Sequence, residues 1–140
     1  MRLVLDASVV IKWFVPELLA AEAEGLIDRE HELLAPDFLL IECANIVWKK
    51  VRRGEMLRAA GDDALVLLSN GAIELIETRP LVEPALQLAR ELEHPVYDCL
   101  YLAAAAAVGG VAVTADRRLF DCTRETSAAA RLQWLGSFSG

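Results

Sequence analysis

Short apolar runs alternate with longer helical patterns along the whole chain, which is typical of an α/β domain. The expected strands cover residues 3–5, 33–35, 73–77, 111–114 and 132–135. The first of them is an unbroken apolar run, as expected for a parallel strand that is buried on both faces. Residues 73–77 alternate apolar and acidic side chains, which indicates a strand near the edge of the sheet. We therefore predict a three-layer α/β/α fold with a mostly parallel sheet of four to five strands.

Helical patterns fill the segments between these strands. They cover residues 7–15, 18–30, 38–53, 56–69, 81–92 and 99–108, and a short helix follows residue 115. Asp37 is the expected N-cap of the third helix, and Gly54 is its expected C-terminal cap. We expect residues 94–97 to form a loop, so that Asp98 begins the next helix. Residues 99–108 are apolar on every side, which predicts a buried helix.

Length and composition describe one globular domain. The 140 residues are 55% hydrophobic and 25% charged, and we expect residues 1–140 to fold as a single unit. Charged residues interrupt the apolar N-terminal stretch, and no uncharged run is long enough to cross a membrane. The cysteines Cys43, Cys99 and Cys122 are an odd number without CxxC spacing. This usage favours reduced thiols and a cytoplasmic protein without contact to a membrane.

Four acidic residues occupy positions that suit a functional site. Asp6 and Asp116 each follow an apolar strand, at the carboxyl edge where open α/β sheets hold their sites. Asp98 begins a buried helix, and Glu42 lies inside an apolar helix, where a lone carboxylate is costly to bury. Each aspartate taken singly is also a good N-cap, and Glu42 also fits a polar stripe that faces solvent. Four oxygen donors without clustered His or Cys favour Mg²⁺ or Mn²⁺ over Zn²⁺.

Four short motifs resemble those of the PIN-domain ribonucleases, and their order and the chain length resemble VapC-type toxins of bacterial toxin–antitoxin pairs. The motifs, which span residues 3 to about 120, are Leu3-Val4-Leu5-Asp6-Ala7-Ser8, Glu42-Cys43-Ala44-Asn45, Tyr97-Asp98-Cys99-Leu100-Tyr101-Leu102-Ala103 and Val113-Thr114-Ala115-Asp116-Arg117-Arg118-Leu119. The resemblance implies a PIN-like fold and a Mg²⁺-dependent (or Mn²⁺-dependent) endoribonuclease that leaves a 5′ phosphate and a 3′ hydroxyl. It also implies a cognate antitoxin protein as partner and a homodimer.

The resemblance also implies a role for individual residues. The catalytic and metal-binding residues would be Asp6, Glu42, Asp98 and Asp116, and the supporting polar residues would be Ser8, Asn45 and Thr114. Many relatives carry one more acidic residue just after the last motif aspartate. Arg117 and Arg118 stand there in this chain, and the next acidic residue is Asp121. The ligands of any second metal ion are therefore left open at this point.

Three alternatives differ in function. A receiver-type signalling domain needs an acidic pair after its first strand, whereas Asp6 stands alone. A haloacid-dehalogenase-like phosphatase needs Asp-x-Asp there, and Ser8 occupies the second position. A non-catalytic PIN-like module that binds RNA or protein remains the main alternative to an enzyme.

Basic residues mark an expected path for RNA. The net charge of −7 argues against broad, non-specific nucleic-acid binding, although acidic residues gathered for a metal inflate this count. Lys49 lies two helical turns beyond Glu42, about 10 Å along the axis. We predict RNA contacts from Lys49, Arg52, Arg53 and Arg117. The alternative for the first three is stabilisation of the negative end of the helix dipole.

Three large aromatic residues are the remaining feature of the sequence. Trp13, Phe14 and Trp48 lie in the first and third expected helices. The first two are expected either in the core or on a partner surface, because one thin layer of helices does not readily hide so much apolar area.

Overall fold

A five-stranded parallel sheet forms the middle layer of the computed structural model, which describes residues 1–27 and 30–138. The strands are β1 (Arg2–Leu5), β2 (Glu32–Pro36), β3 (Glu74–Ile76), β4 (Val111–Thr114) and β5 (Leu132–Trp134). Their order is β3-β2-β1-β4-β5, and all of these pairs are parallel. The predicted parallel α/β fold is therefore confirmed, and β3 is an edge strand as its alternating pattern indicated.

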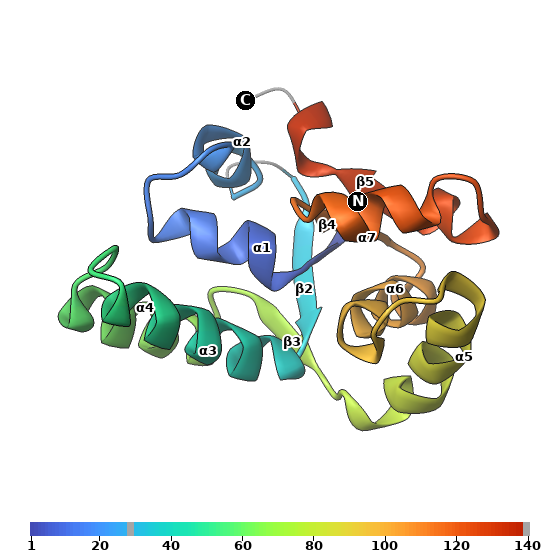
Figure 1. The fold of residues 1–140 in the computed structure, drawn as a ribbon, viewed down its shortest axis with the longest axis horizontal. Coiled ribbons are helices and arrows are strands. Elements are labelled where there is room, and N and C mark those ends of the chain that lie inside the picture. Colours follow the sequence, from blue (N-terminus) through green and yellow to red (C-terminus); the bar gives the residue numbers. More distant parts are fainter. Residues whose placement is uncertain (28–29, 139–140) are drawn as a thin grey trace.

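Helices cover both faces of this sheet (Figure 1). One group consists of α1 (Ala7–Val10), α2 (Ala20–Gly25), α3 (Phe38–Arg52) and α4 (Arg58–Ser69), and the other of α5 (Val82–Leu92), α6 (Val96–Val108) and α7 (Arg117–Thr123). Short 3₁₀ turns follow at η1 (Ile11–Trp13), η2 (Arg79–Leu81), η3 (Ser127–Arg131) and η4 (Leu135–Ser137). Right-handed crossovers explain this grouping, because the chain reverses its direction across the sheet after β3. Within the described residues, no helix is long and apolar enough to span a membrane.

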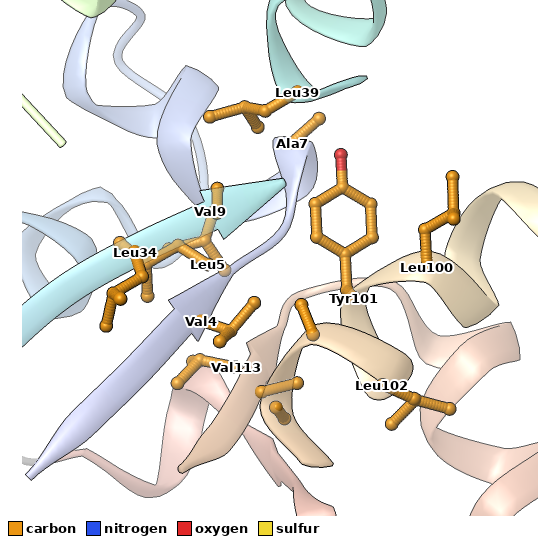
Figure 2. Close-up of a cluster of buried hydrophobic side chains, with 14 of the residues drawn as sticks. Val4, Leu5, Ala7, Val9, Leu34, Leu39, Leu100, Tyr101, Leu102 and Val113 are labelled. Carbon is orange, nitrogen blue, oxygen red and sulfur yellow. The ribbon is translucent and has the colours of Figure 1, made fainter. Parts of the chain in front are cut away.

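Helix α6 lies at the centre of the core. Its residues 99–105 are all buried, as the uniformly apolar sequence predicted. Figure 2 shows the Tyr101 ring standing away from α6, with its hydroxyl directed toward Ala7 and Leu39. Leu3, Val4 and Leu5 of β1 are fully buried between the two groups of helices, and Arg2 at the start of the strand is exposed. The core therefore fixes both β1 and α6, the elements that carry Asp6 and Asp98.

Several predicted helix boundaries were wrong. The first helix is a single α-helical turn that continues as η1, and α2 covers only residues 20–25 because Leu19 adopts a left-handed φ of 68° just before it. The predicted end of that helix includes residues 28–29, which lie outside the described residues. Helix α4 begins two residues later than expected, since Met56 packs into a small apolar cluster with Ile11 and Val15.

Two aspartates that were expected to cap helices do not do so with their side chains. Asp37 occupies the N-cap position of α3 as predicted, but its side chain does not cap the helix. Its Oδ1 accepts hydrogen bonds from the backbone and the hydroxyl of Thr78, and the Thr78 Oγ1 accepts from the Phe38 amide. Helix α6 begins at Val96 and not after Asp98, because Pro95 supplies a residue that needs no amide partner at the helix start. Asp98 therefore lies within the first turn of α6. The predicted cap at Gly54 is confirmed, with φ of 75° just beyond α3.

Candidate active site

One small pocket brings together the four acidic residues that the sequence singled out. Asp6 follows β1, Glu42 lies in α3, Asp98 lies in the first turn of α6, and Asp116 follows β4. All four line a pocket of about 140 Å³, together with Ala7, Ser8 and Ile46. The pocket is at the carboxyl edge of β1 and β4, where the parallel topology was expected to place a site.

Asp6 is the most buried of these acidic residues, with 4% of its surface exposed. Its Oδ1 accepts hydrogen bonds from the Ser8 hydroxyl and the Val9 amide, and its Oδ2 accepts from the Thr114 hydroxyl at 2.6 Å. Burial raises the pKa of Asp6 to about 7; the two hydroxyls oppose this rise, and the nearby Asp98 and Glu42 add to it. Asp6 caps α1, as its position before a helix predicted, and it also lines the pocket at the carboxyl edge of the sheet.

Two hydroxyl groups join the ends of β1 and β4. The Ser8 Oγ accepts from the Ala115 amide at 2.9 Å, and the Thr114 Oγ1 accepts from the Asp116 amide at 3.0 Å. Each hydroxyl also donates to Asp6, so the two strand ends are held in one fixed arrangement. This geometry agrees with the supporting role expected of these two residues. The third predicted supporting residue, Asn45, is exposed and does not line the pocket.

Asp116 and Asp98 complete the rim of the pocket. The Asp116 Oδ1 accepts from the Arg118 amide at 2.9 Å, which caps α7 as predicted. The Asp98 Oδ2 lies 2.6 Å from Nε2 of His94, one helical turn earlier. Sequence reasoning assigned His94 only to a loop, although its spacing of four residues from Asp98 is the signal that could have identified this pair.

Glu42 is half-buried and is held by a residue that sequence reasoning missed. The Tyr101 hydroxyl donates to the Glu42 Oε1 at 2.5 Å. Burial raises the pKa of Glu42, this hydrogen bond opposes the rise, and the nearby Asp98 and Asp116 add to it. Tyr101 lies 59 residues away in the apolar part of α6, so the sequence indicated only a core residue.

The chemistry of the pocket suits a hard divalent cation. The described residues contain no group of three or more His, Cys, Asp or Glu side chains that already stand as a set of metal ligands. The four carboxylates nevertheless face one pocket, and none of them forms a salt bridge with Lys or Arg among residues 1–27 and 30–138. Burial is the main cause of the raised pKa of Asp6 and of Glu42, and repulsion from the neighbouring carboxylates adds to it. The negative charge of the pocket is therefore only partly compensated, by the contact of His94 with Asp98. Oxygen donors with excess negative charge fit Mg²⁺ or Mn²⁺.

Asp121 does not belong to this pocket. It is exposed on α7 and lies 3.6 Å from the Arg124 guanidinium. The pocket lining does not include it. The sequence left open whether Asp121 joins the acidic site, and in this structure it does not lie with the four pocket carboxylates.

The basic residues at the end of α3 divide between two faces of the helix. Lys49 and Arg53 are exposed and follow Glu42 at seven and eleven residues, close to whole helical turns. The Arg52 guanidinium instead lies 5.2 Å from the centre of the Trp48 ring, and both residues line an apolar groove between α3 and α4. Of these three residues, Lys49 and Arg53 are the ones in phase with Glu42.

Arg117 lies beside the pocket in a cluster with aromatic residues. Its guanidinium is 4.3 Å from the centre of the Trp134 ring and 6.0 Å from that of Phe120. Trp134 pairs in register with Thr114, which itself bonds to Asp6. The cluster therefore continues the same carboxyl edge of the sheet, directly beyond Asp116.

Both the sequence and the fold are similar to those of known proteins. Residues 3–125 match the PIN domain family. The chain is 35% identical over 124 residues to Ribonuclease VapC3 of Pyrobaculum aerophilum, covering 85% of this chain and 92% of that protein. The fold is similar to the crystal structure of PAE2754 from the same organism, with a TM-score of 0.72, 25% identity and coverage of 98% and 85% of the two chains. It is also similar to VapBC2 from Rickettsia felis bound to a promoter DNA fragment, with a TM-score of 0.63, 15% identity and coverage of 96% and 98%. The chain thus belongs to the PIN domain family.

Proposed function

We propose that this chain is an endoribonuclease that requires Mg²⁺ or Mn²⁺ and acts as the toxin of a toxin–antitoxin pair. The observation that carries this proposal is the convergence of Asp6, Glu42, Asp98 and Asp116 on one pocket. Membership of the PIN domain family supports a nuclease, and the relative at 35% identity is itself named a ribonuclease. The gathered carboxylates disfavour a PIN-like module that only binds RNA or protein, because such a module has no need for four acidic side chains in one pocket, none paired with Lys or Arg among the described residues.

The carboxylates have distinct tasks in this proposal. Asp6 is the central metal ligand, and Glu42, Asp98 and Asp116 hold the ion from the rim of the pocket. A divalent ion held there would supply Lewis acidity for hydrolysis of the phosphodiester bond, with a 5′ phosphate and a 3′ hydroxyl as the expected products. The hydroxyls of Ser8 and Thr114 fix both oxygens of Asp6. The chain therefore contributes a rigid set of negative charges that needs little reorganisation during the reaction.

Incubation of the purified protein with RNA tests this function. We expect fragments in the presence of Mn²⁺ or Mg²⁺ and none in EDTA. An exonuclease that requires a 5′ phosphate should then degrade the fragments. RNA that is bound but left intact at every metal concentration would favour the non-catalytic alternative.

RNA reaches the pocket, in our proposal, along two basic sites. One is formed by Lys49 and Arg53, on the face of α3 that carries Glu42. The other is Arg117, whose planar side chain is held by Trp134 next to Asp116. Arg52 is the predicted RNA-binding residue with the least support, since its guanidinium lies over Trp48 on another face of α3.

Removing charge at the end of α3 should weaken RNA binding and its dependence on salt. The variant with Lys49→Ala and Arg53→Ala, made in an Asp6→Asn background that does not cut, loses two phosphate contacts. The slope of log K against log [salt] should decrease in size by about 1.4, as expected for two contacts to single-stranded RNA. Fluorescence anisotropy in EDTA measures this slope.

A matched control removes the same charge elsewhere. Arg79→Ala with Arg90→Ala changes two exposed arginines near α5, and this variant should keep the wild-type slope. An unchanged slope in the α3 variant, together with a lower melting temperature, would mean that Lys49 and Arg53 only stabilise the helix dipole.

The proposed partners are an antitoxin protein and a second copy of this chain. Trp13 and Phe14 pack against the core, and the Trp13 indole donates to the Ala23 carbonyl, so these two residues are largely accounted for within the chain. Trp48 remains 56% exposed. We also propose a cytoplasmic location, where RNA is available and the free Cys43 and Cys99 stay reduced.

Light scattering tests the homodimer. We expect a mass near twice the 15.3 kDa of one chain at micromolar concentration. A clean monomer at high protein concentration would contradict the dimer without affecting the proposed chemistry.

A further inference from the structure

Tyr101 is the only fully buried tyrosine among the described residues, and its hydroxyl ends at the proposed active site. Its side chain is 0% exposed and lies in the part of α6 that packs against the sheet. The ring reaches away from α6 toward Ala7 and Leu39, that is, toward the groups of residues that follow β1 and begin α3 (Figure 2). A buried tyrosine hydroxyl needs a hydrogen-bond partner, and here that partner is the Glu42 carboxylate at 2.5 Å.

We propose that Tyr101 is a positioning residue that fixes the Glu42 side chain, so that one carboxylate oxygen is committed to the phenol and the other faces the metal pocket. This inference rests on the proposed function. A glutamate side chain has three rotatable bonds, and Glu42 lies on a half-exposed face of α3 from which it can turn to solvent. The rigid phenol ring, held on all sides by the core, removes that freedom before any ion arrives.

Helix α6 positions two of the pocket carboxylates, because it carries Asp98 and also carries Tyr101, which bonds to Glu42. Asp98 lines the pocket directly, and Tyr101 follows it by three residues on a neighbouring part of the helix surface. Helix α3, which carries Glu42, belongs to the opposite group of helices (Figure 1). The Tyr101–Glu42 hydrogen bond therefore links the two layers at the pocket, and it sets the position of Glu42 relative to Asp98.

The same contact has a competing explanation, in which Glu42 merely satisfies a buried hydroxyl and Tyr101 contributes only to stability. The two explanations differ in what happens to divalent-metal binding. If Tyr101 positions Glu42, its loss must weaken metal binding through Glu42 alone. If it contributes only to stability, metal binding by the folded variant stays at the wild-type level.

Tyr101→Phe removes the hydroxyl and keeps the ring. We expect this variant to remain folded in EDTA by circular dichroism and to bind Mn²⁺ about 10-fold more weakly in calorimetric titration, as is typical when the partner of a metal ligand is lost. The kcat for RNA cleavage should fall by a similar factor, with the KM for RNA unchanged. Tyr97→Phe is the matched control, because Tyr97 lies on the same helix, is 62% exposed and stacks on Phe38 away from any carboxylate contact. It should bind Mn²⁺ like the wild type.

A double-variant cycle decides whether Tyr101 acts through Glu42. In a Glu42→Gln background, Tyr101→Phe should cause no further loss of Mn²⁺ affinity. A further 10-fold loss in that background, or wild-type Mn²⁺ affinity of Tyr101→Phe itself, would overturn the inference. Tyr101→Met, which also lacks the hydroxyl, gives the same comparison if the Phe variant does not fold. A wild-type protein that neither binds Mn²⁺ nor cuts RNA would instead refute the proposed function, and the inference with it.

Discussion

Replacing any one of the four pocket carboxylates by its amide should abolish metal-dependent RNA cleavage. The variants are Asp6→Asn, Glu42→Gln, Asp98→Asn and Asp116→Asn, and each keeps the shape of the side chain while it removes one negative charge. We expect a loss of at least about 100-fold in kcat/KM for each, the size typical of removing one electrostatic contact at a reacting centre. The loss should be largest for Asp6→Asn, because Asp6 is the most buried and the most constrained of the four.

Two further acidic residues provide the controls. Asp63→Asn makes the same chemical change on the exposed surface of α4, and it should leave cleavage unchanged. Asp121→Asn should also retain activity, because Asp121 pairs with Arg124 outside the pocket. Near-normal cleavage by two or more of the pocket variants would contradict the assignment of the site. Loss of cleavage with Asp121→Asn would show that this residue joins the site when RNA is bound.

The sequence predicted the site well where topology alone determines position. Asp6 and Asp116 follow apolar strands, and a parallel sheet must bring such residues to one edge. Glu42 was predicted from the cost of burying a lone carboxylate in an apolar helix. Asp98 was placed correctly for a wrong reason, since it was expected to cap α6 and instead lies in its first turn.

The pattern of apolar and polar positions could not predict contacts between residues far apart in the sequence. Tyr101 and Glu42 are 59 residues apart, and Tyr101 looks like any other core residue of α6 until α3 is placed against it. The charges on α3 show a related limit. The sequence analysis treated the basic residues as one track, whereas helical phase places Lys49 and Arg53 with Glu42, and the contact with the Trp48 ring shows where the Arg52 guanidinium lies. Periodicity gives the face of a helix, but the packing partner decides what that face does.

Without metal, the protein should become less stable as the pH rises from about 4 to 7. Asp6 has a pKa of about 7 in the folded chain against 3.8 for the ordinary side chain, mainly because it is buried. Between these pH values the folded state binds more protons than the unfolded state, so its stability decreases as the pH rises. The full cost of burying an ionised Asp6 is present above pH 7. The difference between these two pKa values corresponds to a loss of at most about 4 kcal/mol in the free energy of unfolding. The folded pKa already includes the effect of the hydrogen bonds from Ser8 and Thr114.

Asp6→Asn removes this cost, because an amide carries no charge to desolvate. The amide presents only one acceptor oxygen to the hydroxyls of Ser8 and Thr114, and the weakened hydrogen bonding costs about 1–2 kcal/mol. The removal of the buried charge outweighs this loss at pH 8. In EDTA at that pH, the variant should therefore melt about 5 °C above the wild type. Near pH 4 the folded wild type holds Asp6 protonated, so only the hydrogen-bond loss remains and the variant should melt slightly below the wild type.

Mg²⁺ should reverse the order of the two proteins. The ion binds only the folded state, so it raises the melting temperature of the wild type, and it does so less in a variant that lacks the central ligand. Melting curves by circular dichroism at pH 5 and 8, with EDTA or with Mg²⁺, measure all of these differences, and Asp63→Asn serves as the control for a change in net charge. If Asp6→Asn melted below the wild type in EDTA at pH 8, the carboxylates would not be held together at a cost in folding energy, and Asp6 would be an ordinary helix cap. A reversed order of melting temperatures between EDTA and Mg²⁺ would show that the same buried negative charge destabilises the metal-free chain and binds the divalent ion.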